Sequence, residues 1–202
     1  MKTFNIYMVG VGGQGIGLLS EVLMRAADHA GFALKAVDTH GLAQRGGMVE
    51  SQLRIGRTVH TPLIPAGKAD LVVALERHEA MRGLRLMAKK NGTLIYYDTV
   101  WQPLEVRLAE AAEVTPDQLQ ETAAKRGVSL VRVQAPDLSD ARMQNIAVLA
   151  HIDRNGLIDG IATDHYRQAM QDLMTGRMLE SNLALFDSIR KGADAPLMAD
   201  GS

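Results

Sequence analysis

The sequence predicts a doubly wound α/β fold, in which a mostly parallel sheet carries helices on both faces. The first observation behind this prediction is a glycine-rich turn between an apolar strand pattern and an apolar helical stripe. The second is the alternation of short apolar runs with helical patterns along most of the 202 residues. The third is a hydrophobic content of 47%, which is ample for one core of this kind. We therefore expect a Rossmann-like sheet with a helical extension at the C-terminus.

The glycine-rich turn follows a strand expected over 6–9. Gly10, Gly12 and Gly15 have the spacing of a dinucleotide-binding loop. The first glycine allows a tight turn, the second lets the backbone approach a ligand or a neighbouring chain, and the third lets the next helix pack closely on the strand. These glycines can also serve turn geometry and packing alone, because a fold does not dictate a function. The candidate ligand-binding residues in this turn are Gly10, Gly12, Gly13, Gln14 and Gly15.

Asp38 is expected at the tip of the second strand, predicted over 32–37. A dinucleotide-binding fold uses an acidic residue at this place to bind ribose hydroxyls, so a nicotinamide cofactor must be considered. The reading that we favour is that Asp38 caps the loop that follows.

That loop, 39–47, is a second glycine-rich segment with unusual polar residues. Its glycines permit positive φ and close approach of the backbone. Arg45 offers a planar fork of donors for carboxylate or phosphate, and Gln44 can donate and accept. Because open α/β sheets bind ligands at the carboxyl ends of their strands, we expect a contact surface here, with Arg45 as its anchor. Its candidate interface residues are Thr39, His40, Gly41, Gln44, Arg45, Gly46 and Gly47.

The rest of the chain predicts a continued α/β domain over 1–190 and a disordered tail over 191–202. Residues 49–55 alternate as an edge or antiparallel strand would, and 71–75 form a short buried strand that ends at Glu76. A helix over 77–90 is followed by a turn at Asn91-Gly92. Further strands are expected over 93–97 and 129–134, and further helices over 116–126, 140–152, 163–173 and 178–189.

Composition excludes several kinds of function. The chain has no cysteine, so it forms no disulfide and cannot hold an iron–sulfur cluster through its own cysteines. None of its six histidines has the spacing of a helical zinc pair, and we expect no metal site. A net charge of -1 is unlike a nucleic-acid-binding protein, and no apolar run suits a membrane helix. Because the N-terminus also lacks the pattern of a signal peptide, a cytoplasmic location is expected.

The two glycine-rich segments together resemble a known family. Gly-Val-Gly-Gly-Gln-Gly (10–15) followed by Asp-Thr-His-Gly-Leu-Ala-Gln-Arg-Gly-Gly (38–47) is similar to the γ-type component of 2-oxoacid:ferredoxin oxidoreductases. Within that family the small β subunit of the indolepyruvate enzymes is most alike. The resemblance continues through 51–56, Pro62 and 69–76, and it spans most of 4–190. Asn145 resembles a position that the family keeps polar, although it also reads as an ordinary surface amide of a helix.

The resemblance implies a non-catalytic subunit of a heteromeric enzyme. The large catalytic subunit would hold thiamine diphosphate and [4Fe-4S] clusters, and the complex would oxidise indolepyruvate or another arylpyruvate to an acyl-CoA while reducing ferredoxin. CoA would be the co-substrate, and the turn at 10–15 would contact CoA or the partner. The chain's own residues agree with a non-catalytic role. It has no cysteines, and it lacks the Gly-Asp-Gly segment with a later Asn-Asn by which thiamine diphosphate enzymes resemble one another.

Two other functions compete with this reading. The chain could be a free-standing NAD(P)-dependent dehydrogenase that uses the turn at 10–15 and Asp38, or a nucleotide-binding regulatory protein. A dehydrogenase needs an acid–base pair beside its nicotinamide, and no His–Asp pair stands out in the sequence. The loop over 39–47 would also interfere with an adenosine ribose. We therefore favour the subunit.

Overall fold

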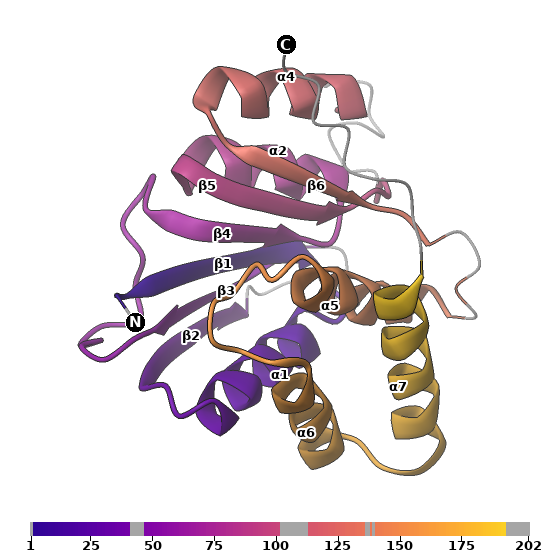
Figure 1. The fold of residues 1–202 in the computed structure, drawn as a ribbon. Helices are drawn as coiled ribbons and strands as arrows, with labels where there is room; N and C mark the ends of the chain where they lie inside the picture. Colours follow the sequence, from indigo (N-terminus) through magenta and orange to yellow (C-terminus); the bar gives the residue numbers. More distant parts are fainter. Residues whose placement is uncertain (1, 41–46, 102–112, 136–137, 139, 193–202) are drawn as a thin grey trace.

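The computed structural model describes residues 2–40, 47–101, 113–135, 138 and 140–192. Its six-stranded sheet has the order β2-β3-β1-β4-β5-β6 and is parallel except at β3, which confirms the predicted α/β class (Figure 1). The strands are β1 (Phe4–Val11), β2 (Leu34–His40), β3 (Met48–Ile55), β4 (Ala69–Ala74), β5 (Ala88–Tyr97) and β6 (Ser129–Val133). The helices are α1 (Ile16–His29), α2 (Arg77–Leu86), α4 (Pro116–Arg126), α5 (Gln144–Arg154), α6 (Thr163–Leu173) and α7 (Gly176–Lys191), with a 3-10 turn η1 (Ala141–Met143).

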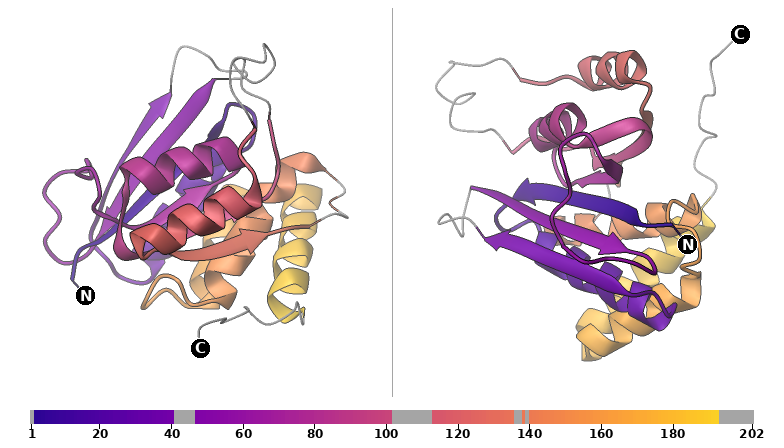
Figure 2. Two further views of the ribbon diagram at one scale, coloured as in Figure 1. Left: turned by 90° about the horizontal axis from the view of Figure 1, so that it is seen from above. Right: turned by 90° about the vertical axis from the view of Figure 1, so that its left-hand side faces the viewer.

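Helices cover both faces of the sheet, as the sequence predicts. α2 and α4 lie on one face, and α1, α5, α6 and α7 lie on the other (Figures 1 and 2). Alternate residues of β1 serve the two layers, because successive side chains of a strand point to opposite faces. Ile6 and Met8 pack with α1 and α5, whereas Tyr7 and Val9 pack with α2. The molecule therefore has two apolar cores with the sheet between them.

β3 is antiparallel, as predicted, but it is an interior strand. It pairs with β2 on one side and with β1 on the other, with Met48 opposite Val11 and Ser51 opposite Asp38. The strand before it also begins and ends later than expected, at Leu34 and His40 instead of 32 and 37. As a result β2, which directly neighbours β1 in a dinucleotide-binding fold, lies one strand further away here.

The predicted helix over 77–90 is too long. α2 ends at Leu86, and Ala88 already pairs with Ala69 of β4. Asn91 has a φ of 62°, and a Cβ on Gly92 would lie 3.0 Å from the carbonyl oxygen of Asp70. The predicted turn is therefore an irregularity inside β5, where the pairing with β4 shifts register. Likewise, the helix expected from 140 starts as η1 and becomes regular only from α5.

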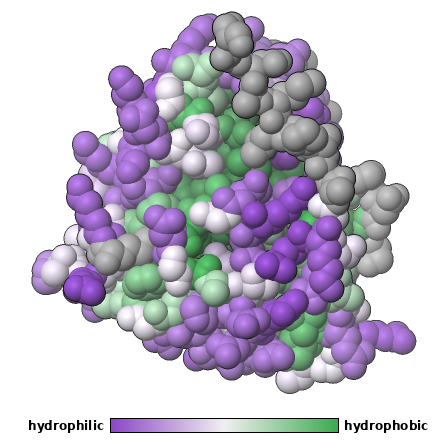
Figure 3. Space-filling model, viewed as in Figure 1, coloured by the Kyte–Doolittle hydropathy of each residue, from purple (hydrophilic) through white to green (hydrophobic). Residues whose placement is uncertain are grey.

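The C-terminal helices belong to the core. Tyr166, Met170 and Met174 of the α6 region and Phe186 of α7 are buried, while Met178 is 51% exposed. None of the helices in the described ranges has the length and apolar character that crossing a bilayer requires. On the face shown in Figure 3, hydrophilic residues surround hydrophobic ones that lie nearer the middle. The predicted disordered tail lies outside the described residues from 193 onward.

Candidate functional site

The glycine turn after β1 lies at the carboxyl edge of the sheet and leads into α1. Gly13 and Gly15 have φ values of 100° and 85°, a region that L side chains rarely adopt. A Cβ on Gly15 would also lie only 2.5 Å from the Nδ2 atom of Asn145. The turn thus needs glycine at this position both for its backbone and for the close approach of α5.

Gln14 has a structural task inside the turn. Its side chain is completely buried. Its Oε1 accepts a hydrogen bond from the backbone N–H of Val11 at 2.7 Å, and its Nε2 donates to the carbonyl oxygen of Leu75 at 3.0 Å. The amide therefore joins the end of β1 to the end of β4. Ligand contacts in this turn are left to its backbone.

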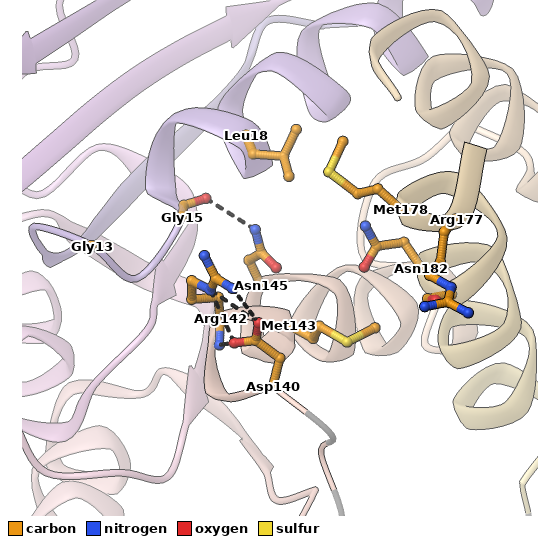
Figure 4. A pocket seen from close by; sticks show the side chains of 11 residues that line it. Gly13, Gly15, Leu18, Asp140, Arg142, Met143, Asn145, Arg177, Met178 and Asn182 are labelled. Carbon is orange, nitrogen blue, oxygen red and sulfur yellow. Dashed lines mark hydrogen bonds and ion pairs between the residues drawn. The ribbon is translucent and has the colours of Figure 1, made fainter. Parts of the chain in front are cut away.

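A hollow of about 580 Å³ opens beside the turn, between the N-terminus of α1, the start of α5 and α7 (Figure 4). The amides of Asn145 and Asn182 project into it from opposite sides, and the thioether of Met178 points toward Leu18. The lining residues are Gly13, Gly15, Leu18, Asp140, Arg142, Met143, Asn145, Arg177, Met178, Ser181 and Asn182.

Several polar groups at the hollow are already hydrogen-bonded. Asn145 donates from Nδ2 to the carbonyl oxygen of Gly15 at 3.2 Å, so α5 is tied to the glycine turn. Arg142 donates from Nη2 to Asp140 at 2.6 Å, and hydrogen bonds from Arg142 lower the pKa of Asp140 to about 2. The first turn of α1 has no acidic residue, so no side chain of that turn offsets the positive end of the helix dipole. The hollow can accept an anionic group next to apolar surface.

Asp98, just beyond β5, is held in an ion cluster. Its side chain is 2% exposed and lies 2.7 Å from Nη2 of Arg77. Arg132 donates to it from Nε at 2.7 Å. Burial alone would raise the pKa of Asp98, but the hydrogen bonds from Arg132 and Arg77 outweigh it and lower the pKa. The carboxylate of Asp98 is ionised and its charge is balanced by Arg77 and Arg132, so it serves a structural role.

Glu76, at the end of β4, is fully buried. Its carboxylate accepts the N–H of Glu79 and caps α2. Burial raises the pKa of Glu76 to about 7, although the backbone N–H groups of His78 and Glu79 oppose the shift. This carboxyl therefore titrates near neutral pH, unlike an ordinary glutamate.

Asp38 does not lie at a strand tip, because β2 continues to His40. Its Oδ1 accepts hydrogen bonds from Ser20 of α1 and Ser51 of β3, whose hydroxyl oxygens are 2.7 Å apart. Since strands lie about 4.8 Å apart, the inserted β3 also places β2 about 10 Å from β1. Asp38 thus joins α1 to the sheet, where neither of the two sequence-based readings had placed it.

The second glycine segment meets the first at this edge. The backbone N–H of Gly12 donates to the carbonyl oxygen of Gly47 at 2.8 Å. Thr39 and His40 complete β2, while Gly41, Gln44, Arg45 and Gly46 lie outside the described residues. Gly47, the last residue of the second segment, therefore lies beside the first segment.

Sequence reasoning missed most of the hollow. For Asn145 the sequence left open a position that the family keeps polar and an ordinary surface amide of a helix, whereas its side chain is 3% exposed and bonded to Gly15. Nothing local indicates that Asn182 and Met178 line a hollow, because the sequence does not show that α7 faces the glycine turn. In the described ranges, no three His, Asp or Glu residues form a group that could hold a metal ion.

The fold and this edge define an α/β domain with a glycine-turn site and no cysteine to carry a redox cluster. The family model for pyruvate ferredoxin/flavodoxin oxidoreductase matches residues 5–192. The chain belongs to this family and is a subunit of a multi-subunit oxidoreductase. An indolepyruvate oxidoreductase subunit, IorB, from Archaeoglobus fulgidus is 33% identical over 184 residues, which are 89% of this chain and 90% of the relative.

Solved structures of this family share the fold. The γ subunit of a keto/oxoacid ferredoxin oxidoreductase from Geobacter sulfurreducens has a TM-score of 0.64 and 18% identity, and covers 93% of this chain and 96% of its own. A 2-oxoglutarate:ferredoxin oxidoreductase from Magnetococcus marinus, solved with 2-oxoglutarate, coenzyme A and succinyl-CoA, has a TM-score of 0.70 and 18% identity. That match covers 94% of this chain but 31% of the longer one. The same fold therefore occurs as a separate subunit and as part of a larger chain.

Proposed function

We propose that this chain is the non-catalytic small subunit of an oxidoreductase that converts indolepyruvate or another arylpyruvate, with CoA, to an acyl-CoA and reduces ferredoxin. The observation that carries the proposal is the 33% identity to an indolepyruvate oxidoreductase subunit along 90% of that relative. Thiamine diphosphate and [4Fe-4S] clusters belong to the large subunit, where thiamine diphosphate supplies the carbanion chemistry. The absence of cysteines here supports this division.

The turn from Gly10 to Gly15 is proposed as a contact for CoA. CoA carries a diphosphate and a further phosphate, and helix N-termini preceded by glycine turns suit such groups. The N-terminus of α1, whose first turn has no acidic residue, and the hollow lined by Leu18 and Met178 support this assignment. The contact comes from the backbone of Gly13 and Gly15, since the N–H of Gly12 is bonded to Gly47 and the side chain of Gln14 is occupied within the turn.

The loop over 39–47 is proposed as a contact with the large subunit, with Arg45 as its anchor. Interface energy concentrates in few residues, among which arginine is enriched. Arg45→Ala should weaken assembly by at least about 2 kcal/mol while the chain stays folded. Unchanged assembly and activity in a folded variant would make Arg45 an ordinary surface residue.

Reconstitution tests the function. The purified large and small subunits, separately and together, are assayed for CoA-dependent ferredoxin reduction with indolepyruvate, phenylpyruvate, pyruvate and 2-oxoglutarate. We expect activity only from the complex, and the highest kcat/KM with an arylpyruvate. A complex that prefers pyruvate or 2-oxoglutarate would contradict the proposed substrate class. Activity of the small subunit alone would contradict its non-catalytic role.

A further inference from the structure

Exposed large hydrophobic side chains lie at both edges of the sheet. Leu86 closes α2 near the start of β4, and the carbonyl of Leu63 binds Arg54 near the start of β1, so both lie at the amino edge of the sheet. Met48, Trp101 and Met178 lie at the carboxyl edge, where Met48 and Met178 are beside the glycine turn. Among the described residues, the exposed large hydrophobics are Met48, Leu63, Leu86, Trp101 and Met178, between 38% and 60% exposed.

Trp101 is the single tryptophan of the chain and is 44% exposed. The backbone leading to it is fixed, because Asp98 donates its N–H to Val133 at 2.9 Å and Thr99 accepts from the N–H of Arg77 at 3.0 Å. The second of these bonds ties the segment to the start of α2. A large aromatic side chain is thus presented to solvent from an anchored backbone, which is how interface anchors are held.

Met48 lies at the start of β3 and contacts Arg82 of α2. It is 38% exposed and stands opposite Val11, the last residue of β1. Nη1 of Arg82 lies 2.9 Å from its sulfur, and Nε of Arg82 lies 3.3 Å from Glu79. The guanidinium of Arg82 is thereby held beside Met48 with its side chain 50% exposed. Met48, Arg82 and Trp101 are called the carboxyl-edge surface below.

We propose that the carboxyl-edge surface is where the large, cofactor-bearing subunit docks. The proposal rests on the proposed function. If CoA is held at the glycine turn and the reacting centre lies in the large subunit, that subunit has to cover this edge for the thiol to reach it. Gly12 binds Gly47, which directly precedes Met48, so the surface is continuous with the glycine turn. Tryptophan, methionine and arginine are also the residue types enriched in interfaces.

The test compares two edges of the same sheet. The large subunit is titrated with wild-type chain, Trp101→Ala, Met48→Ala and Leu86→Ala, and Kd is measured by calorimetry. Leu86 is the matched control because it is 59% exposed at the amino edge. We expect Kd to rise about thirtyfold for Trp101→Ala and about tenfold for Met48→Ala, as for interface anchors, and to change less than about twofold for Leu86→Ala. Circular dichroism melting confirms that each variant is folded.

Unchanged Kd for both Trp101→Ala and Met48→Ala, or a larger loss for Leu86→Ala, would overturn the proposal. CoA binding to the isolated small subunit is measured in parallel for the wild type and Trp101→Ala. We expect equal CoA affinity in both, because Trp101 does not line the hollow. A wild-type chain that binds no CoA alone or in the complex would refute the CoA assignment, and the Kd series would still decide where the large subunit docks.

Discussion

Gly15→Ala tests the link between the glycine turn and α5. Gly15 has a φ of 85°, where a residue with a Cβ costs about 1–2 kcal/mol. The added Cβ would meet Nδ2 of Asn145 at 2.5 Å and displace an amide that donates to the carbonyl of Gly15. Losing that hydrogen bond costs about 1 kcal/mol more. The free energy of unfolding should therefore fall by about 2–3 kcal/mol, which for a chain of this size lowers Tm by about 4–12 °C.

Gly17→Ala is the matched control. Gly17 lies in α1, and a Cβ there would meet nothing within 4 Å. Because alanine favours the helix over glycine, this variant should be more stable by up to about 1 kcal/mol. The two substitutions, two residues apart, should thus change Tm in opposite directions. Calorimetric melting and chemical denaturation measure both.

A double-mutant cycle separates the clash from the backbone cost. In Asn145→Ala the displaced amide is absent, so adding Gly15→Ala should cost only the part due to φ. If Gly15→Ala lowers the free energy of unfolding equally in the wild type and in Asn145→Ala, the Asn145 side chain moves aside without cost. A Gly15→Ala variant as stable as the wild type would refute the whole argument.

Three further predictions follow from the site. The pKa of Glu76 is about 7 in the folded chain against an ordinary 4.5, so between these pH values the folded chain keeps a proton that the unfolded chain releases. The free energy of unfolding therefore falls as pH rises from 4.5 to 7, by up to about 3 kcal/mol. Glu76→Gln should remove that loss, gaining stability over the wild type at pH 8 but little at pH 5 in chemical denaturation; an equal difference at both pH values contradicts this. NAD(H) should bind the isolated chain weakly or not at all, since β3 separates β2 from β1 and Asp38 is bonded to Ser20 and Ser51; micromolar binding by calorimetry that Asp38→Ala abolishes would revive the dehydrogenase. The purified chain should show no visible absorption band, because it has no cysteine for a cluster; a stoichiometric chromophore would disprove this.

Local signals explain which elements the sequence could predict. The start and end of α4 were predicted because both are local: Thr115 and Gln118 form a capping box, and Gly127 ends the helix with a φ of 63°. The start of β5 was not, because the helical pattern through Lys90 and the Asn91-Gly92 pair were overridden by pairing with β4. Tertiary pairing of this kind leaves no mark within the segment itself.

The candidate site divides in the same way. The glycine turn was predictable because its backbone makes demands that only certain residues meet, as at Gly15. The partners of the turn were not, since Asn145 reaches Gly15 across 130 positions of sequence. The burial of Gln14 likewise depends on the carbonyl of Leu75 from a different strand. One side of the hollow was thus visible in the sequence, and the other side required the fold.

The antiparallel β3 has a consequence for how the edge can vary between relatives. The connections after β1 and β4 lead into α1 and α2, so any change in their length must keep a helix seated on the sheet. β2 and β3 are consecutive antiparallel strands that pair directly with each other, and among the described residues no helix lies between them. A connection between adjacent antiparallel strands can in general lengthen, shorten or change charge without repacking a core. A preference for one partner that depends on the connection from β2 to β3 can therefore change readily between relatives. The glycine turn is instead constrained by its backbone geometry.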